Sequence, residues 1–251
     1  MVNIAIIGYG KMGKEIEKVA IEKGVKVISI IDPLNEKATH REINKNSLKG
    51  VDVAIDFTLP KFALENARKI SNLGVNIVLG TTGWYERKAE LEEIIKENGT
   101  GLIWSGNFSI GVNVFFKIIE SASKIINSIE EYDIAISDVH HNQKLDSPSG
   151  TALMIGNIVL ENIKRKKEII HGSPEGRIKE DQLQISSQSI GFVPGIHTVT
   201  IDSFADTIKL EHSARNRTGF ASGAVMAAEF IKGKKGFFNI DSLMDEIVGG
   251  D

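Results

Sequence analysis

Apolar and polar residues follow a strand–helix alternation from the start of the chain to about residue 109. Continuous apolar runs, typical of strands buried on both faces, occupy 2–7, 25–31, 51–57, 75–79 and 101–104. Stretches with helical periodicity lie between several of these runs, at 14–23, 62–71 and 86–97. This order predicts a parallel sheet with right-handed crossovers, in which ligands bind beyond the carboxyl ends of the strands.

The pattern changes after Ser109. Helices are expected over 110–127 and 152–160, and half-buried strands over 132–139, 185–189, 197–203 and 207–212. The charged run 164–167 fits a solvated helix end or turn, and the pattern becomes helical again over 223–231. We therefore expect an α/β fold with a Rossmann-type parallel-sheet domain, formed by 1–109 and 217–251. A second α+β domain, 110–216, has a mostly antiparallel sheet.

Composition narrows the function classes. The 251 residues include no cysteine, which excludes disulfides, thiolate metal sites and cysteine nucleophiles, and with them the thioester-forming aldehyde dehydrogenases. The net charge of -3 gives no reason to expect nucleic acid or an anionic membrane as partner. No apolar run reaches the length of a membrane span, and no basic leader precedes the first strand. We expect a cytoplasmic protein that binds neither nucleic acid nor a membrane.

A glycine motif marks a dinucleotide site. Gly8-Tyr9-Gly10-Lys11-Met12-Gly13 lies between the first strand and the first helix, and Asp32 ends the second strand. The glycines allow a tight turn close to a pyrophosphate, and the acid can hold a ribose hydroxyl. Asp32 favours NADH, whereas Lys11 and Lys37 can offset the repulsion of a 2'-phosphate, so NADH and NADPH both remain open.

Three further loops lie on the same edge of the predicted sheet. They are 56–58, 80–83 and 105–108, and each alone would be an ordinary connecting loop. Together they fit a cofactor wall. The predicted contacts in them are Gly80, Thr81, Thr82, Ser105, Gly106, Asn107 and Phe108.

The second domain carries a cationic segment at 138–152. His140 and His141 end a strand, Lys144 follows, and Ser149-Gly150-Thr151 opens a helix. Free N–H groups at a helix start favour a carboxylate or phosphate, so this segment is either an acidic-substrate site or a solvated loop. Adjacent histidines on a strand point apart, and no metal-ligand spacing occurs, so we expect no metal. We interpret His171, His197 and His212 as structural histidines.

The segment 140–152 resembles the signature of the dihydrodipicolinate reductases, His-His-x-x-Lys-x-Asp-Ala-Pro-Ser-Gly-Thr-Ala. Other segments match the family in the same order, so that the resemblance covers essentially the whole chain. These are Gly8 to Gly13, 56–58, 80–83, 107–113, 193–197 and 219–221.

The resemblance implies a reductase of lysine and diaminopimelate biosynthesis. Such an enzyme uses NADH or NADPH to reduce the cyclic dicarboxylate from the preceding synthase to tetrahydrodipicolinate. His140 would donate the proton, and Lys144 would assist it and hold a carboxylate. The other implied substrate contacts are His141, Ser149, Gly150 and Thr151. Family members are homotetramers built through the second-domain sheet and close their two domains on the substrate, so we expect a homotetramer.

Two positions depart from the family pattern. Ser189 stands where arginine is usual, and Ser147 where alanine is usual. Losing an arginine near the hinge could weaken closure or carboxylate capture, so the alternative function is a non-catalytic NAD(H)-binding paralogue or sensor. A DNA-binding sensor would need a helix-turn-helix or basic face, and neither is found. A different amino-acid dehydrogenase would leave the histidine pair and the Ser-Gly-Thr turn unexplained.

Overall fold

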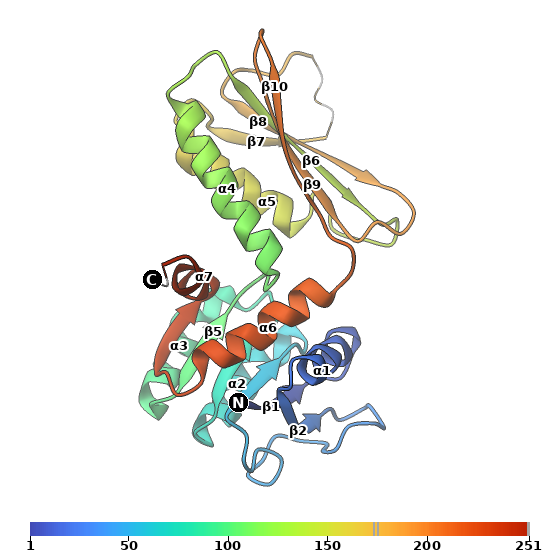
Figure 1. The fold of residues 1–251 in the computed structure, drawn as a ribbon, viewed down its shortest axis with the longest axis vertical. Helices are drawn as coiled ribbons and strands as arrows, with labels where there is room; N and C mark the ends of the chain where they lie inside the picture. The colour runs from blue at the N-terminus through green and yellow to red at the C-terminus, as the bar shows by residue number, and fades with distance from the viewer. Residues whose placement is uncertain (173, 175, 250–251) are drawn as a thin grey trace. The chain divides into compact units, whose positions relative to one another are not determined.

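The computed structural model describes residues 1–172, 174 and 176–249, and the chain divides into two compact units (Figure 1). The first comprises Met1–Ile110 and Arg217–Asp251, and the second Gly111–Asn216. The predicted two-part α/β fold class is confirmed. None of the helices in the described ranges combines the length and the apolar character that crossing a membrane requires.

The first unit is built on a six-stranded sheet in which every strand pair is parallel. Its strand order is β11-β5-β4-β3-β1-β2. The direction of winding reverses between β1 and β3, and ligands bind at such switch points in sheets of this kind. The strands are β1 (Asn3–Ile7), β2 (Lys26–Ile31), β3 (Val53–Asp56), β4 (Asn76–Leu79), β5 (Gly101–Trp104) and β11 (Gly236–Asn239).

Helices cover both faces of this sheet, which is why its strands are apolar without alternation. On β1, Ile4 and Ile6 pack under α1, α6 and α7, whereas Ala5 and Ile7 pack under α2 and α3. The helices are α1 (Lys11–Glu22), α2 (Ala63–Asn72), α3 (Lys88–Asn98), α6 (Thr218–Ile231) and α7 (Ile240–Gly249), with short 3-10 turns at Pro60–Phe62 and Tyr85–Arg87. Helix α1 begins three residues earlier than predicted, inside the glycine motif.

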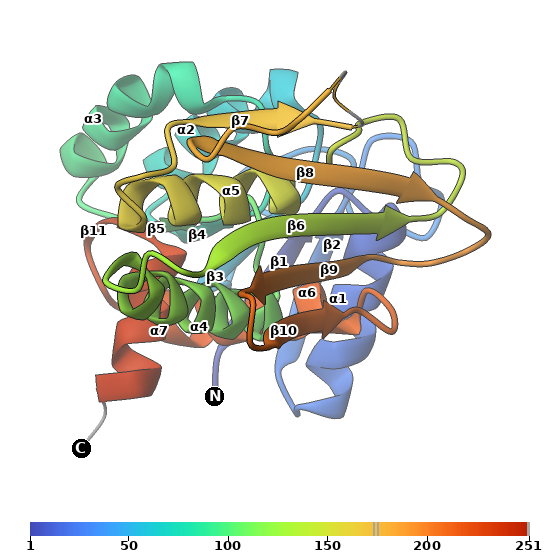
Figure 2. The ribbon, with the colours of Figure 1, turned by 90° about the horizontal axis from the view of Figure 1, so that it is seen from above.

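The second unit is a mixed five-stranded sheet with two helices on one face (Figure 2). Its order is β10-β9-β6-β8-β7, and β6 pairs antiparallel with β9 and parallel with β8. A core around Phe115, Ile136, Ile155 and Val199 joins the sheet to the helices. The elements are α4 (Ile110–Asn127), β6 (Asp133–His140), α5 (Gly150–Asn162), β7 (Glu168–His171), β8 (Gln182–Ser189), β9 (Ile196–Asp202) and β10 (Thr207–Ser213).

One expectation for the second unit holds only in part, and another is wrong. The run 164–167 follows the end of α5 with Lys164 and Lys167 exposed, as expected, but Lys166 is only 3% exposed. Its ammonium donates to the carbonyl oxygens of Glu180 at 2.9 Å and Gln182 at 2.8 Å and pairs with Asp133 at 2.6 Å. Both hydrogen bonds are partly buried, and sequence periodicity does not reveal that a lysine side chain supplies their donor. His171 lies exposed on β7 and is not a core histidine.

Candidate active site

The glycine motif forms the turn from β1 into α1. Gly8 has φ +87°, and a Cβ on Gly13 would lie 2.2 Å from the Gly8 carbonyl oxygen, so both positions require glycine. No side chain caps the helix at Gly10, and no acidic residue occupies the first turn. The first N–H groups of α1 are therefore suited to an anionic pyrophosphate.

A cavity of about 420 Å³ opens beside this turn, within the first unit. Gly8, Gly10, Asp32, Arg41 and Thr58 contribute to its lining, which is mainly apolar in its other residues. This combination of apolar walls with Asp32 and Arg41 among several charged side chains fits the nucleoside part of a dinucleotide.

Asp32 has a second role that the sequence did not predict. Its carboxylate accepts N–H groups from Tyr9 at 2.7 Å, Leu34 at 2.8 Å and Asn35 at 2.9 Å. Burial raises the pKa of Asp32, but these bonds and the nearby Arg41 outweigh it and lower the pKa overall. The acid thus stays ionised and shapes the loop around the cavity, and its contact with a ribose remains a prediction.

Several predicted cofactor residues build the sheet edge through their side chains. Ser105 donates to the Asn107 carbonyl oxygen at 2.8 Å, and Asn107 accepts the N–H of Ser109 at 2.9 Å. Phe108 is 1% exposed and packs against Phe57. Contacts from this loop to a cofactor would therefore come from backbone groups.

Asp56 is a residue of this edge whose importance the sequence analysis missed. The carboxylate is fully buried and accepts hydrogen bonds from the Thr58 N–H and hydroxyl, from Asn66 and from Thr81. Burial raises the pKa of Asp56 despite these bonds. Its position at the carboxyl end of a buried strand was the available signal. Thr82 is exposed nearby, and Gly80 lacks a Cβ that would lie 2.2 Å from the Phe57 ring.

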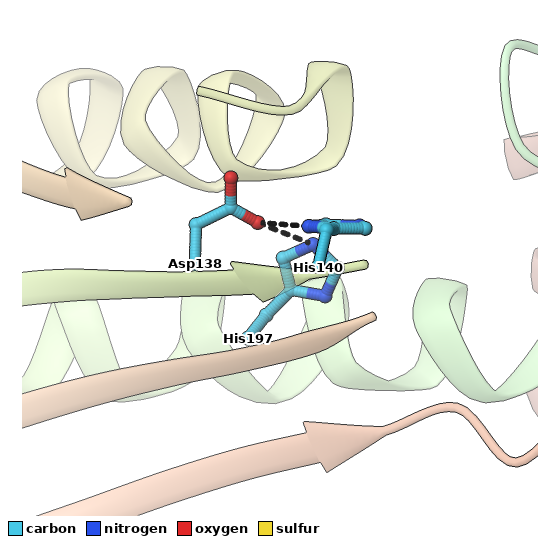
Figure 3. A group of neighbouring side chains, drawn as sticks. All are labelled: Asp138, His140 and His197. Atoms are coloured by element: carbon cyan, nitrogen blue, oxygen red, sulfur yellow. Dashed lines mark ion pairs between the residues drawn. The ribbon is translucent and has the colours of Figure 1, made fainter. Parts of the chain in front are cut away.

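In the second unit, strand geometry gathers an acid and two histidines. Asp138 and His140 are two residues apart on β6 and share a face. Antiparallel pairing with β9 sets His197 directly opposite Asp138. Figure 3 shows both imidazoles directed at one oxygen of the carboxylate. His197, interpreted above as structural, therefore belongs to the candidate site.

The Asp138 carboxylate is 2% exposed and densely hydrogen-bonded. Its Oδ1 lies 3.0 Å from His140 Nδ1 and 3.3 Å from His197 Nε2, and it accepts the Ser149 hydroxyl at 2.9 Å. Its Oδ2 accepts the Ser149 N–H at 2.8 Å. Burial raises the pKa of Asp138, but these partners outweigh it and lower the pKa to about 2. The group carries a permanent negative charge.

His140 has a depressed pKa. Burial is the largest cause, and the nearby His197 and Lys144 act in the same direction, while Asp138 opposes them. A Cβ on Gly195 would lie 2.9 Å from His140 Nε2, so the glycine keeps space open beside that nitrogen. An imidazole with one nitrogen on a carboxylate and the other beside free space suits acid–base chemistry.

Ser149 is the N-cap of α5 and lies within the hydrogen-bonded cluster. It is 2% exposed, and its hydroxyl accepts the Ala152 N–H at 3.1 Å while it donates to Asp138. The structure thus places this predicted substrate contact inside the protein network. Thr151 lies in the first turn of α5 and is half-buried.

A carboxylate occupies the predicted anion site. Lys144 Nζ lies 2.7 Å from Asp146 Oδ1 and 2.8 Å from its Oδ2. The bond to Lys144 and one from the Gly150 N–H lower the pKa of Asp146. The ammonium and the start of α5 therefore converge on one carboxyl group. His141 is half-buried, and its Nδ1 has no hydrogen-bond partner among the described residues.

Two further features bear on the sequence predictions. Asp138, His140 and His197 bring three potential metal-ligand atoms within 4.8 Å of one another. The two imidazoles approach the carboxylate as ion-pair partners, and Ser149 donates two hydrogen bonds to it. These contacts account for the short distances. Ser189 pairs with His140 across β8 and β6 and is exposed, so the departure from the family pattern lies next to the candidate site.

Comparison with known proteins gives a consistent result. Family models described as dihydrodipicolinate reductase, N-terminus and C-terminus, match residues 2–108 and 111–244. The chain is 37% identical to a 4-hydroxy-tetrahydrodipicolinate reductase of Christiangramia forsetii, with 98% of each chain covered. It is 34% identical to one of Methanococcus vannielii, with 95% of this chain and 97% of the relative covered.

A solved structure shares the fold. It is a dipicolinate-bound dihydrodipicolinate reductase from Paenisporosarcina sp. TG-14, with a TM-score of 0.78 and 24% identity over 95% of this chain and 97% of the other. An amine dehydrogenase from Mycobacterium smegmatis is similar at a TM-score of 0.62 and 12% identity, over 94% of each chain. The two family models together span nearly all of the sequence, and the chain belongs to the dihydrodipicolinate reductase family.

Proposed function

We propose that the protein is an NADH- or NADPH-dependent 4-hydroxy-tetrahydrodipicolinate reductase of lysine and diaminopimelate biosynthesis. One structural observation supports the proposal in addition to family membership. The Lys144 ammonium already holds a carboxylate, that of Asp146 at 2.7 Å, and the Gly150 N–H helps to lower the pKa of that carboxyl group. A dicarboxylate substrate would exchange with this internal group.

The cofactor would bind to the first unit. The uncapped start of α1 would receive the pyrophosphate, and the cavity between Asp32, Arg41 and Thr58 would receive the adenosine half. The reduced nicotinamide supplies a hydride. Arg41 supports NADPH as well as NADH, because a guanidinium in this cavity can balance the charge of a 2'-phosphate.

The residues of the second unit would bind and protonate the substrate. Lys144 and the start of α5 would neutralise one carboxylate, and His141 with Thr151 would lie near the other. The 4-hydroxyl group of the substrate would leave as water. Negative charge would develop on the conjugated ring when it accepts the hydride, and an imidazolium at His140 would neutralise it by releasing the proton on Nε2. Gly195 leaves space for the ring beside that nitrogen.

We infer that the protein acts in the cytoplasm as a homotetramer. Large apolar side chains exposed on the second unit support assembly: Phe192 is 95% exposed, Phe204 109% and Ile208 44%. Static light scattering of the purified protein tests this. A monomer at micromolar concentration would contradict it.

Two substitutions test the assignment of roles. His140→Ala should lower kcat with little change in cofactor affinity, whereas Lys144→Ala should raise KM for the substrate and lower kcat. Ser189→Arg restores the usual family residue and should change kcat by less than about tenfold if the present site is competent. Wild-type rates in both alanine variants would disprove the site. Activity that appears only with Ser189→Arg would favour the non-catalytic paralogue.

A further inference from the structure

Asp138 is the most heavily hydrogen-bonded side chain around His140, and the proposed mechanism does not yet include it. We propose that Asp138 is a positioning residue, which keeps a proton on His140 Nδ1 so that the proton transferred to the substrate is the one on Nε2. This inference rests on the proposed function, because it specifies how His140 would act within it.

Asp138 is held from three elements. Ser149 at the start of α5 donates its N–H and hydroxyl, His197 approaches from β9, and Ser187 on β8 lies 3.4 Å from Oδ2. The side chain is 2% exposed. A carboxylate fixed in this way has one remaining partner whose orientation it can determine, the ring of His140 at 3.0 Å.

The chemistry of imidazole gives this contact a consequence. A permanently ionised carboxylate accepts and does not donate, so the nitrogen that faces it must carry hydrogen. Neutral His140 therefore has its proton on Nδ1, and the imidazolium adds the second proton on Nε2. Transfer of that proton to the substrate breaks the Nε2–H bond and leaves neutral His140, with Asp138 still ionised and facing the protonated Nδ1 at 3.0 Å.

The positive groups around His140 disfavour its protonated form, so that form needs the negative charge of Asp138. Lys144 from the following loop and His197 from β9 disfavour the imidazolium, and so does burial. Asp138 on the same strand and the more distant Asp146 favour it. Asp146 is the exposed partner of Lys144, and a substrate carboxylate would replace it there. Asp138 is thus the fixed negative charge that sustains the proton donor.

The first test is made on the wild-type protein. Long-range proton–nitrogen correlation spectra of the imidazoles, recorded above the pKa of His140, report which ring nitrogen is protonated. We expect Nδ1–H with unprotonated Nε2 for His140. An Nε2–H tautomer would overturn the proposal, whether or not the enzyme turns over, so this result is separate from the proposed function.

The second test uses Asp138→Asn, with the exposed Asp181→Asn of the same unit as the matched control. The amide can donate to Nδ1 and invert the tautomer. We expect kcat to fall about 10²- to 10⁴-fold, the range of a general acid's contribution. The alkaline limb of the pH–rate profile should move to lower pH, with the affinity for NADH unchanged.

A conservative variant separates positioning from folding. Asp138→Glu keeps the charge and should retain more activity than Asp138→Asn, while Asp181→Asn should match the wild type. An unshifted pH profile in Asp138→Asn would refute the proposal. If the wild-type protein reduces no substrate at all, the proposed function fails. The tautomer of His140 still shows whether Asp138 keeps the proton on Nδ1.

Discussion

Replacing Ser149 with alanine should destabilise the protein by an amount that its contacts allow us to work out. The hydroxyl is the N-cap of α5, and loss of such a cap costs about 1 kcal/mol. It also donates to the buried, ionised Asp138 at 2.9 Å, and a hydrogen bond to a charged group contributes about 1.5–3 kcal/mol. Because one oxygen makes both contacts, we expect a loss of about 3 kcal/mol in the free energy of unfolding.

Thermal unfolding followed by far-ultraviolet circular dichroism measures this loss. For a chain of this size, 3 kcal/mol corresponds to a fall in Tm of about 6–12 °C. Ser147→Ala is the matched control, because Ser147 is exposed two residues earlier and the same substitution there should stay within about 0.5 kcal/mol. Equal melting temperatures for the two variants would refute the reasoning, since the cap and the Asp138 contact would then carry no energy.

The remaining predictions concern acid stability, the cofactor turn, the anion site and Lys166. The pKa of Asp138 falls from its ordinary 3.8 to about 2, so its contribution of about 2 kcal/mol to the free energy of unfolding is present above pH 4 and lost as pH falls through about 2. In Asp138→Asn, the free energy of unfolding measured with urea should therefore depend less on pH in this acid range, and an unchanged dependence would count against the network. Gly13→Ala sets a Cβ 2.2 Å from the Gly8 oxygen and should weaken NADH binding at least about tenfold by fluorescence titration, with unchanged affinity counting against the turn as the pyrophosphate site. Asp146→Asn frees Lys144, so KM for the substrate should fall about 2- to 5-fold, whereas a rise would mean that Asp146 orients the lysine. Lys166→Met should cost about 2–4 kcal/mol by urea denaturation while exposed Lys167→Met costs under 0.5, and equal effects would refute the buried cation.

The sequence predicted the first unit well because its signals are local. Strands buried on both faces give unbroken apolar runs such as that before Gly8, and glycine marks the turn that follows. The start of α1 was predicted less accurately, since Lys11 begins this helix inside the glycine motif. The parallel β6–β8 and β8–β7 pairs and the strand β7 depend on distant pairing and left no local pattern.

The candidate site was predicted only in part, for a similar reason. The segment from His140 to Thr151 is contiguous, so its residues were found together. His197 lies 57 residues beyond His140 in the chain and reaches Asp138 only through the β6–β9 register, which alternation alone does not specify. Asp138 could have been predicted, because it lies two residues before His140 on the same strand. Side chains two residues apart on a strand point to the same face.

The most direct test of the proposed reductase is a coupled assay. The upstream synthase, pyruvate and aspartate semialdehyde generate the substrate in situ, and the near-ultraviolet absorbance of NADH or NADPH is followed in separate reactions. We predict a loss of absorbance that requires every component, and the two rates rank the cofactors. Protein that binds NADH yet consumes neither cofactor would contradict the assignment and favour a non-catalytic relative.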